Sequence, residues 1–409
     1  MRCSYEDFDI RRRPGRINFS EQNFYRGVHD FLLLEGEAQA GGLCRSLDVD
    51  GSPLDIGGGH FLDVRNQDVV EFLFSFMPAS EWNQYDRKSL IHIHDQYIAH
   101  PFEANIWQLS INMQVDYLES IACAGVNSSE KQPFEFVDWI YWKLGNKIAE
   151  NYMLPYNQKM FGNNLSELGT YWLNKLPSVS FRETLQSCLE HKPYGKLPGH
   201  AKFYYPKQFG YGELWNRMAN YLGEKIKFNQ KVKGIDFNTR SVCTDDGKKY
   251  DADLIVSTIP WTSFEKIIGM PSNIVDDIRK LKHTSVKVEY YDKNLDTDAH
   301  WIYYPELALS YHRILARHNF VPNGRGYWTE TNMDRDEMRE KGGVFSYVNE
   351  YAYPLNTLQK PKIMDRLLSW SKEHGVIGLG RWGEHSHYNS DVTVERAMAL
   401  AERINNNEL

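Results

Sequence analysis

The order of apolar and polar residues along the chain predicts helices and strands in alternation. Short apolar or alternating runs at residues 29–35, 54–62 and 89–102 are typical of strands, and a His-Asp pair within the third run indicates a hairpin turn. Apolar residues at helical spacing behind an asparagine cap predict a helix over residues 66–77. The first part of the chain therefore favours an α/β arrangement.

Helical spacing dominates the middle of the chain. It occurs at residues 106–122, 134–154 and 180–190, which together predict a helical insertion, and again at residues 213–223. Strands follow at residues 226–260, with an Asp-Asp-Gly turn among them.

Alternation returns in the last third of the chain, where it predicts a second, antiparallel sheet. The alternating stretches are residues 284–292, 300–306 and 343–354. Residues 375–404 then read as a strand, a glycine loop and a closing helix.

The composition narrows the function classes. Of the 409 residues, 42% are apolar and 25% are charged, as in ordinary globular proteins, and an aromatic share of 14% suits stacking surfaces. A net charge of -7 argues against a binder of nucleic acid or of anionic membranes. The five cysteines lie far apart without metal-ligand spacing, so we expect no metal site and a reduced, cytoplasmic chain. Neither a membrane span nor a signal peptide is expected from the apolar runs.

An acid and two glycine clusters follow the strand at residues 29–35. In a dinucleotide-binding βαβ unit, the acid at the end of the second strand accepts hydrogen bonds from ribose hydroxyls, and glycines let the backbone approach the pyrophosphate. Glu35 fits the first role, and Gly41, Gly42 and residues 57–59 fit the second. A surface glutamate and two ordinary turns would give the same pattern.

Three distant stretches resemble a superfamily of flavoproteins that includes amine oxidases, protoporphyrinogen oxidase and UDP-galactopyranose mutase. Residues 35–46 with 54–61 resemble its flavin-binding signature, residues 226–260 its middle portion and residues 375–404 its closing element. The resemblance implies bound FAD and a closing helix whose N-terminus stabilises negative charge on the reduced flavin. The cofactor-binding residues that it implies are Glu35, Gly41, Gly42, Leu43, Gly57, Gly58, Gly59, Val232, Arg381, Asn389 and Asp391.

The helical region resembles the UDP-galactopyranose mutases in particular. Residues 134–176, with their Pro-Tyr-Asn-x-Lys core, are similar to a mutase stretch, as are residues 85–109, 300–306 and 310–314. The likeness runs from about residue 28 to residue 404. It implies the substrate-binding residues Arg87, Tyr156, Asn157, Lys175, Tyr303, Arg313, Tyr353, His387 and Tyr388.

The chemistry of a nucleotide diphosphate matches these residue types. A guanidinium holds concentrated negative charge through paired hydrogen bonds, whereas an ammonium offers a point charge. We expect Tyr303, Arg313 and Tyr353 to hold the diphosphate, with Lys175 where the mutases usually have arginine. Each also has an ordinary explanation, such as a tyrosine in a core or an arginine paired with a surface acid.

Together, the pattern and the resemblance predict an α/β fold. It has a Rossmann-like FAD-binding domain, a helical insertion and a second antiparallel β-sheet domain. The FAD-binding domain combines three ranges, the helical substrate domain has one and the sheet domain combines two: residues 1–78, 207–262 and 375–409, then 106–206, then 79–105 and 263–374.

The resemblance implies an FAD-dependent UDP-galactopyranose mutase-like enzyme, an intramolecular transferase that interconverts pyranose and furanose forms of a nucleotide sugar. In the mutases N5 of the reduced flavin is the nucleophile, so no protein residue is expected to attack the sugar, and His60 is a candidate for a supporting role. The expected partners are the nucleotide sugar and an electron donor such as NAD(P)H or a reductase; a homo-oligomer remains open. Glu35, Gly58, Arg313 and Arg381 should border one shared cavity.

Two alternatives remain, and departures from the mutases keep them open. One is an FAD oxidoreductase similar to protoporphyrinogen oxidase or amine oxidase, and the other is a nucleotide-sugar binder without flavin. Residues 8–20, where a GxGxxG loop is expected, retain only Gly15, which a sequence error or frameshift would explain. Phe161 replaces a usual tryptophan, an extra glycine moves His60 by one position, and His387 or Tyr388 replaces a substrate tyrosine.

Overall fold

Strands from distant parts of the chain meet in the region that begins before Glu35. The computed structural model describes residues 30–63, 65–128, 130–173, 179–195, 201–338, 342–406 and 408, so the predicted glycine loop at residues 8–20 lies outside the described residues. Strand β1 (Leu33–Leu34) pairs in parallel with β9 (Ile226–Lys227), and β13 (Ile255–Ser257) pairs in parallel with β20 (Val376–Gly378). Parallel pairs of this kind are typical of α/β proteins.

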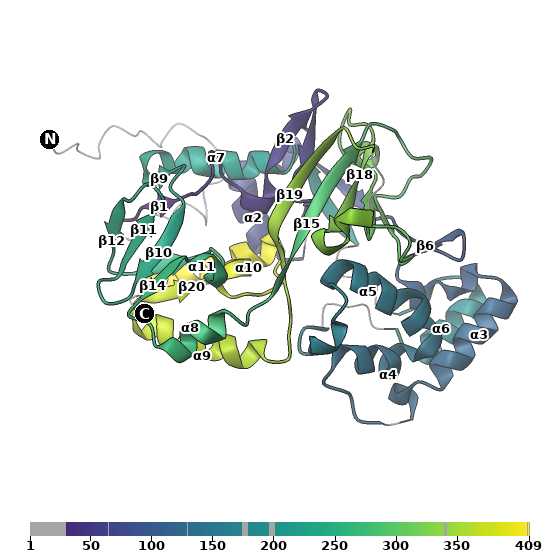
Figure 1. Ribbon diagram of the computed structural model, residues 1–409. Helices are drawn as coiled ribbons and strands as arrows, with labels where there is room; N and C mark the ends of the chain where they lie inside the picture. The colour runs from purple at the N-terminus through teal and green to yellow at the C-terminus, as the bar shows by residue number, and fades with distance from the viewer. Residues whose placement is uncertain are drawn as a thin grey trace.

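A four-stranded sheet lies beside these pairs, on the left of Figure 1. Its strands follow the order β12-β11-β10-β14 and span Lys249–Asp251, Ser241–Thr244, Val232–Asp236 and Lys266–Ile268. The predicted Asp-Asp-Gly turn joins β11 to β12, and Gly247 there has the positive φ of 80° that glycine tolerates best.

Two helices cover this sheet and change the predicted domain boundaries. Helices α8 (Ser272–Ile278) and α9 (Lys360–Glu373) share a core with β10 and β20 that includes Ile235, Ile278 and Leu367. The prediction assigned both helices to the sheet domain. They lie instead against the strands near the cofactor segments, because their apolar faces cover that side of the strands.

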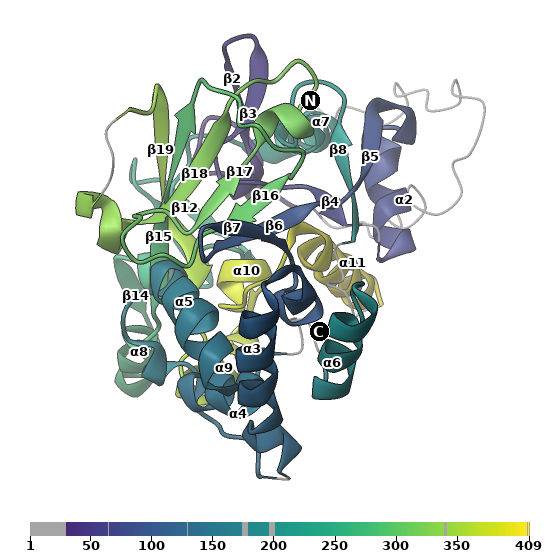
Figure 2. The same cartoon turned by 90° about the vertical axis from the view of Figure 1, so that its right-hand side faces the viewer.

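A seven-stranded sheet forms the centre of the protein, and its strands stand side by side in Figure 2. The order is β19-β15-β18-β17-β16-β6-β7, and the strands in that order span Phe345–Pro354, His283–Tyr291, Tyr327–Asn332, Arg313–Leu315, Trp301–Tyr303, Ser89–Ile93 and Gln96–Ala99. Five of its six pairings are antiparallel, but β16 and β6 run parallel. The sheet is therefore mixed, which corrects the antiparallel prediction. The predicted β6–β7 hairpin is confirmed.

The predicted helical insertion is confirmed and lies at the lower right of Figure 1. Its helices are α3 (Ile111–Ala122), α4 (Phe136–Ile148), α5 (Leu154–Phe161) and α6 (Phe181–Glu190). Lys159 of α5 is fully buried and its Nζ donates to the carbonyl oxygens of Tyr304 and Glu306, both at 2.8 Å. Burial lowers the pKa of this ammonium to about 7, although Glu306 supports its charge. Lys159 therefore ties the insertion to the loop that follows β16.

The remaining elements frame the two cofactor segments. Helix α2 (Gln67–Phe76) is capped by Asn66, as predicted, and α7 (Gly212–Leu222) packs near it. A small sheet joins β4 (Leu62–Asp63), β8 (Lys202–Pro206) and β5 (Trp82–Asp86). The chain closes with α10 (Gly380–Gly383) and α11 (Ser390–Asn405).

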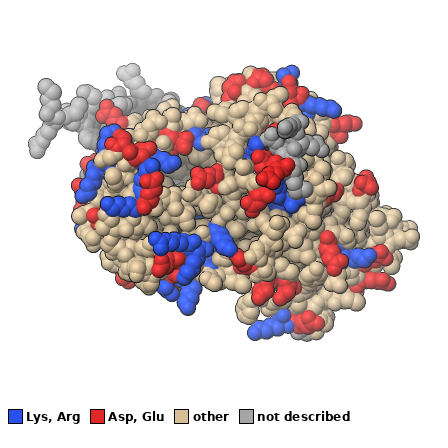
Figure 3. All heavy atoms as spheres, in the orientation of Figure 1, with Lys and Arg blue, Asp and Glu red and all other residues tan. Residues whose placement is uncertain are grey.

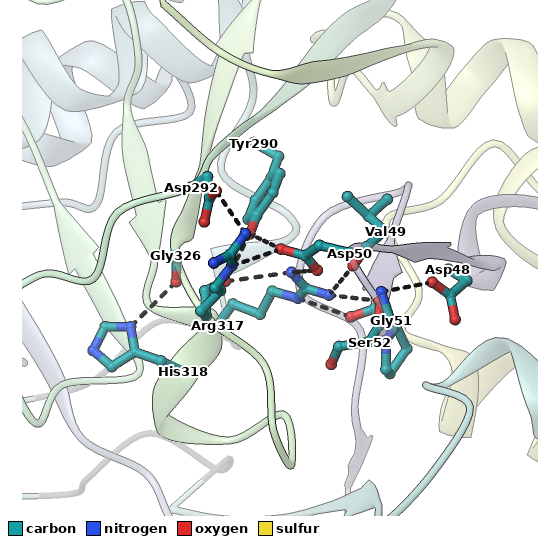
Figure 4. A network of polar contacts seen from close by, with 12 residues as sticks. Asp48, Val49, Asp50, Gly51, Ser52, Tyr290, Asp292, Arg317, His318 and Gly326 are labelled. Carbon is teal, nitrogen blue, oxygen red and sulfur yellow. Dashed lines mark hydrogen bonds and ion pairs between the residues drawn. The ribbon is translucent and has the colours of Figure 1, made fainter.

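A buried arginine attaches the first hairpin to the central sheet. The hairpin consists of β2 (Ser46–Val49) and β3 (Ser52–Asp55). Arg317 is fully buried, and its guanidinium donates to the carbonyl oxygens of Val49 at 3.1 Å and Ser52 at 2.6 Å and to the Asp50 carboxylate at 3.1 Å (Figure 4). Because an unpaired buried cation is costly, these contacts fix where the hairpin, and the glycines after it, can lie.

Charges of both signs are interspersed on the face shown in Figure 3. No helix within the described ranges has the length and apolarity that crossing a membrane requires.

Asp55, at the end of β3, is a buried acid that sequence reasoning missed. Its carboxylate is fully buried and accepts hydrogen bonds from Ser46 Oγ at 2.5 Å and Tyr205 OH at 3.0 Å. Burial raises the pKa of this carboxyl to about 7, although the two hydroxyls favour its charged form. The unfolded chain releases this proton at lower pH than the folded protein does.

We therefore expect the free energy of unfolding to fall as the pH rises from about 4 to about 7, the interval between the unfolded and folded pKa values of Asp55. Asp55→Asn should flatten this dependence, measured as the urea midpoint of both proteins across that interval. Asp86→Asn, at a side chain that is 82% exposed, is the control. Parallel pH profiles for wild type and Asp55→Asn would contradict the assignment.

Candidate functional site

A cavity of about 510 Å³ opens between the helical insertion, the central sheet and the segment before α11. Its walls include residues of α4, α5, β16 and β17. Six of the predicted substrate residues line it: Tyr156, Asn157, Tyr303, Arg313, His387 and Tyr388. The fold thus gathers residues that are more than two hundred positions apart in sequence on the wall of one cavity.

Three of the polar side chains stand in one row across the sheet. Tyr303 of β16 lies directly opposite Arg313 of β17, which in turn lies opposite Glu330 of β18. Cross-strand partners are the nearest side-chain neighbours on a sheet face. The register of the sheet therefore decides that a phenol, a guanidinium and a carboxylate meet here.

Arg313 and Glu330 form a buried ion pair. Arg313 Nη2 donates to Glu330 Oε2 at 2.5 Å, and the Glu330 side chain is only 1% exposed. Burial disfavours the charge of Glu330, but the guanidinium of Arg313 lowers the pKa of this carboxyl to about 2. Burial likewise opposes the charge of Arg313, but Glu330 holds the pKa of the guanidinium above its usual value. Both groups therefore stay charged at neutral pH.

The rest of the Arg313 guanidinium points no hydrogen bond at the protein. Its Nη2 also lies 3.5 Å from the Tyr353 hydroxyl, but within the described residues Nε and Nη1 donate to no acceptor, and Nε is buried. Buried donors without partners are rare in folded proteins. An acceptor in the cavity, such as a phosphate oxygen, would satisfy them.

Two further predicted residues lie just behind the cavity wall. Arg87 Nη2 donates to the Tyr303 hydroxyl at 2.5 Å, and its guanidinium lies 4.9 Å from the Trp301 ring. Tyr353 packs against His387 with 4.8 Å between ring centroids. Asn157 Nδ2 donates to the Met153 carbonyl of its own helix at 2.7 Å, which leaves its Oδ1 for a ligand. Lys175 lies outside the described residues.

The predicted cofactor segments occupy the other side of this region. Glu35 follows β1, and its carboxylate accepts a hydrogen bond from the backbone N–H of Glu37 at 2.9 Å. Burial raises the pKa of this carboxyl. Gly41 has φ of 109° and begins the short turn that contains Gly42 and Leu43. Val232 is the first residue of β10.

Glycines 57–59 allow three close approaches of the backbone. A Cβ on Gly57 would lie 1.9 Å from the Leu43 carbonyl oxygen, one on Gly58 2.3 Å from Glu330 Oε1, and one on Gly59 2.0 Å from the Leu315 side chain. The two glycine clusters therefore touch each other, and the second also touches the ion pair. Their absence of side chains has a packing reason beside any role with a cofactor.

The end of the chain closes the site around Arg381. This guanidinium donates to the carbonyl oxygen of Tyr388 from Nε and Nη2 at 3.0 and 2.8 Å and to that of Ala352 at 3.0 Å. It thereby fixes the segment that leads to Asn389, where α11 starts without a side-chain cap, and to Asp391 in its first turn. Unsatisfied N–H groups at a helix start favour an anionic group.

The expectation of one cavity bordered by all four marker residues is not met. Of the four, Arg313 lines the cavity, whereas Glu35, Gly58 and Arg381 do not. Gly58 contacts the carboxylate paired with Arg313, and Arg381 binds the backbone of the lining residue Tyr388. The correction has a physical reason: the Glu330 side chain and the 57–59 backbone fill the space between the cavity and the cofactor segments.

His60 is buried between the two sides. Its Nδ1 lies 3.1 Å from the Gly58 carbonyl oxygen, and its ring stacks on Tyr211 at 6.4 Å. Burial, together with the charge of Arg381, lowers the pKa of this imidazole to about 4. His60 is therefore neutral at physiological pH and can serve as a hydrogen-bond partner rather than as a cation.

Comparison with known proteins identifies the lineage of this arrangement. The sequence profile of a family described as "Flavin containing amine oxidoreductase" matches residues 25–288, well over half of the chain. The chain belongs to this family. FAD is accordingly its cofactor, and the protein is an enzyme of the flavin-dependent amine oxidase superfamily.

Solved structures agree with this flavoprotein fold. A reduced UDP-galactopyranose mutase is similar over 91% of this chain and 88% of that chain, with 19% identity and a TM-score of 0.79. A protein from Exiguobacterium sp. 255-15 with the provisional name protoporphyrinogen oxidase is similar over 92% and 93%, with 13% identity and a TM-score of 0.65. A putrescine oxidase variant gives 91% and 93%, 12% identity and a TM-score of 0.56. These likenesses show the fold.

The flavoprotein's described residues fit FAD at several points. Glu35 ends a strand with capacity to accept from a ribose hydroxyl, glycines in both clusters keep the backbone bare, and α11 begins without a side-chain cap. We expect Glu35 to hold the ribose, the backbone of residues 41–43 and 57–59 to approach the cofactor, and the start of α11 to face its negatively charged end.

Sequence reasoning missed the acids of the site. Glu330 was overlooked although it stands in the middle of the strand Tyr327–Asn332, where every residue but the first is buried. A charged residue inside such a strand signals a buried partner. Glu103 and His100, which also line the cavity, carried no comparable signal.

Gly57→Ala should lower the FAD content of the purified flavoprotein, because a Cβ there collides with the Leu43 backbone and forces the two glycine clusters apart. The measurement is visible flavin absorbance relative to protein absorbance. Gly234→Ala is the matched control, since its Cβ would have its nearest neighbour at 3.5 Å. Full FAD content in Gly57→Ala would show that the contact is not needed.

Glu330→Leu should destabilise the protein by about 3–5 kcal/mol, because it leaves the buried charge of Arg313 unpaired. The double variant Arg313→Met/Glu330→Leu should regain most of this loss, since no buried charge remains. Urea unfolding of the three proteins measures the difference. A double variant as unstable as the single one would argue that shape, rather than charge, is what the pair contributes.

Proposed function

We propose that the protein is a UDP-galactopyranose mutase-like enzyme that isomerises a nucleotide sugar between pyranose and furanose forms. The observation that carries the proposal is the Arg313 guanidinium, held on the cavity wall by Glu330 with Nε and Nη1 lacking acceptors among the described residues. Such a fixed donor pair suits a phosphate oxygen. An apolar or cationic substrate would leave the donors unsatisfied.

The surrounding phenols support binding of a diphosphate. Burial raises the pKa of the Tyr156 and Tyr353 hydroxyls, so both stay protonated and donate hydrogen bonds. Tyr303, whose hydroxyl accepts from Arg87, can donate its own proton into the cavity. Glu330 neutralises one unit of positive charge, so Arg313 acts through directed hydrogen bonds more than through net charge.

Each part of the wall would have a separate task in the reaction. Reduced FAD supplies a nucleophile for the anomeric carbon when it is bound. Arg313 and the phenols would hold the departing diphosphate in place so that it can return to the same sugar. Aromatic walls that include Trp139, Phe161 and Trp172 would exclude water, which would otherwise hydrolyse the sugar.

The same aromatic walls favour a second candidate, an FAD oxidase or dehydrogenase of an apolar substrate. Apolar residues such as Leu144, Met153 and Met160 contribute to the lining. The two functions differ in their need for oxygen and for a diphosphate, so one assay separates them.

We expect the reduced holoprotein to convert UDP-galactopyranose to the furanose form without oxygen, followed by chromatography of the products. Arg313→Ala should weaken UDP binding by about tenfold or more, because charge-assisted hydrogen bonds are lost. Arg279→Ala, at an exposed side chain on α8, is the control. Oxygen-dependent turnover of an apolar amine or alcohol, with no furanose product and unchanged UDP affinity in Arg313→Ala, would favour the oxidase.

A further inference from the structure

The cavity has a second polar region, away from the Arg313 row. The β6–β7 hairpin ends at Ala99 and runs into the turn Phe102–Ala104, and this connection places His100 and Glu103 on the cavity wall. The neighbouring wall is formed by Tyr152. None of these three residues was among the predicted site residues.

Both titratable side chains face the cavity without a protein partner. Within the described residues, the only donor that reaches the Glu103 carboxylate is its own backbone N–H, and burial raises the pKa of this carboxyl. His100 has a ring contact with Tyr303 at 5.2 Å and no hydrogen bond to a described residue. Burial, together with the charge of Arg87, lowers the pKa of its imidazole to about 3, so the ring is neutral. Buried polar groups in this state call for a ligand or water.

The charge pattern decides which part of a ligand belongs here. A carboxylate repels phosphate, whereas the Arg313 guanidinium attracts it, so the two regions orient a diphosphate toward Arg313. A carboxylate also accepts two hydrogen bonds at once, and adjacent hydroxyl groups supply two donors at matching spacing. The neutral His100 ring can accept or donate a third hydrogen bond to the same ligand.

We propose that Glu103, with His100 beside it, binds a vicinal diol of the nucleotide sugar and thereby orients the ligand in the cavity. This inference rests on the proposed function. The diol belongs either to the ribose of the nucleotide or to the hexose, and the two sources are separable with three ligands: UDP, 2′-deoxy-UDP and UDP-galactopyranose.

The test is calorimetric titration of the FAD-loaded, full-length protein with each ligand. The variants are Glu103→Ala, Glu103→Gln, which keeps one acceptor, and the control Glu150→Gln at an exposed position of the same helical region. FAD absorbance and the unfolding midpoint of each variant confirm that the fold is kept.

If the ribose is the source, wild type should prefer UDP over 2′-deoxy-UDP by about tenfold, and Glu103→Ala should lose this preference. If the hexose is the source, the affinity ratio between UDP-galactopyranose and UDP should fall by about tenfold in Glu103→Ala. Glu103→Gln should give an intermediate value in either case, and Glu150→Gln should match wild type.

Two outcomes would overturn the inference, and they differ in what they leave standing. If Arg313→Ala weakens all three ligands but the Glu103 variants change neither ratio by more than about twofold, the diol site is wrong and the diphosphate site stands. If wild type binds none of the three ligands, the proposed function falls together with the inference.

Discussion

The ion pair of Arg313 and Glu330 is the constraint on which the site depends. Its partners face each other across β17 and β18, so the sheet register alone brings them together. A shift of one residue would turn one of them to the opposite face of the sheet. Glu330 also contacts Gly58, whose missing side chain admits the carboxylate. One buried acid thus links the central sheet, the cavity and a cofactor segment, and no residue in this chain of contacts can change its size or charge alone.

The layers of the protein are joined by buried cations rather than by apolar contact alone. Arg317 binds the backbone of the first hairpin, and Lys159 binds the carbonyl groups after β16. Apolar faces tolerate sliding, but a buried cation must keep each acceptor or pay its desolvation. These two residues therefore set the relative positions of the cofactor side and the substrate side to within a hydrogen-bond length. A site shared by several layers requires such precision.

The cavity is polarised along its wall, with a guanidinium row at one side and a carboxylate with a neutral imidazole at the other. Aromatic residues separate the cavity from water elsewhere. In such a setting directed hydrogen bonds are stronger than in solvent, so few groups suffice to orient a ligand. The family supplies the redox cofactor, while the residues of this wall decide which molecule reaches it.

The sequence by itself determined the elements, the family and much of the list of polar residues. Local periodicity and caps predicted α2 behind Asn66, the helical insertion, the β6–β7 hairpin and the closing helix, because these depend on neighbours within a few positions. Only the tertiary structure decided how they combine. It made the central sheet mixed, moved α8 and α9 to the cofactor side, and added Glu330, Glu103 and His100 to the site. These features arise from strand register and from contacts between residues hundreds of positions apart, for which periodicity carries no signal.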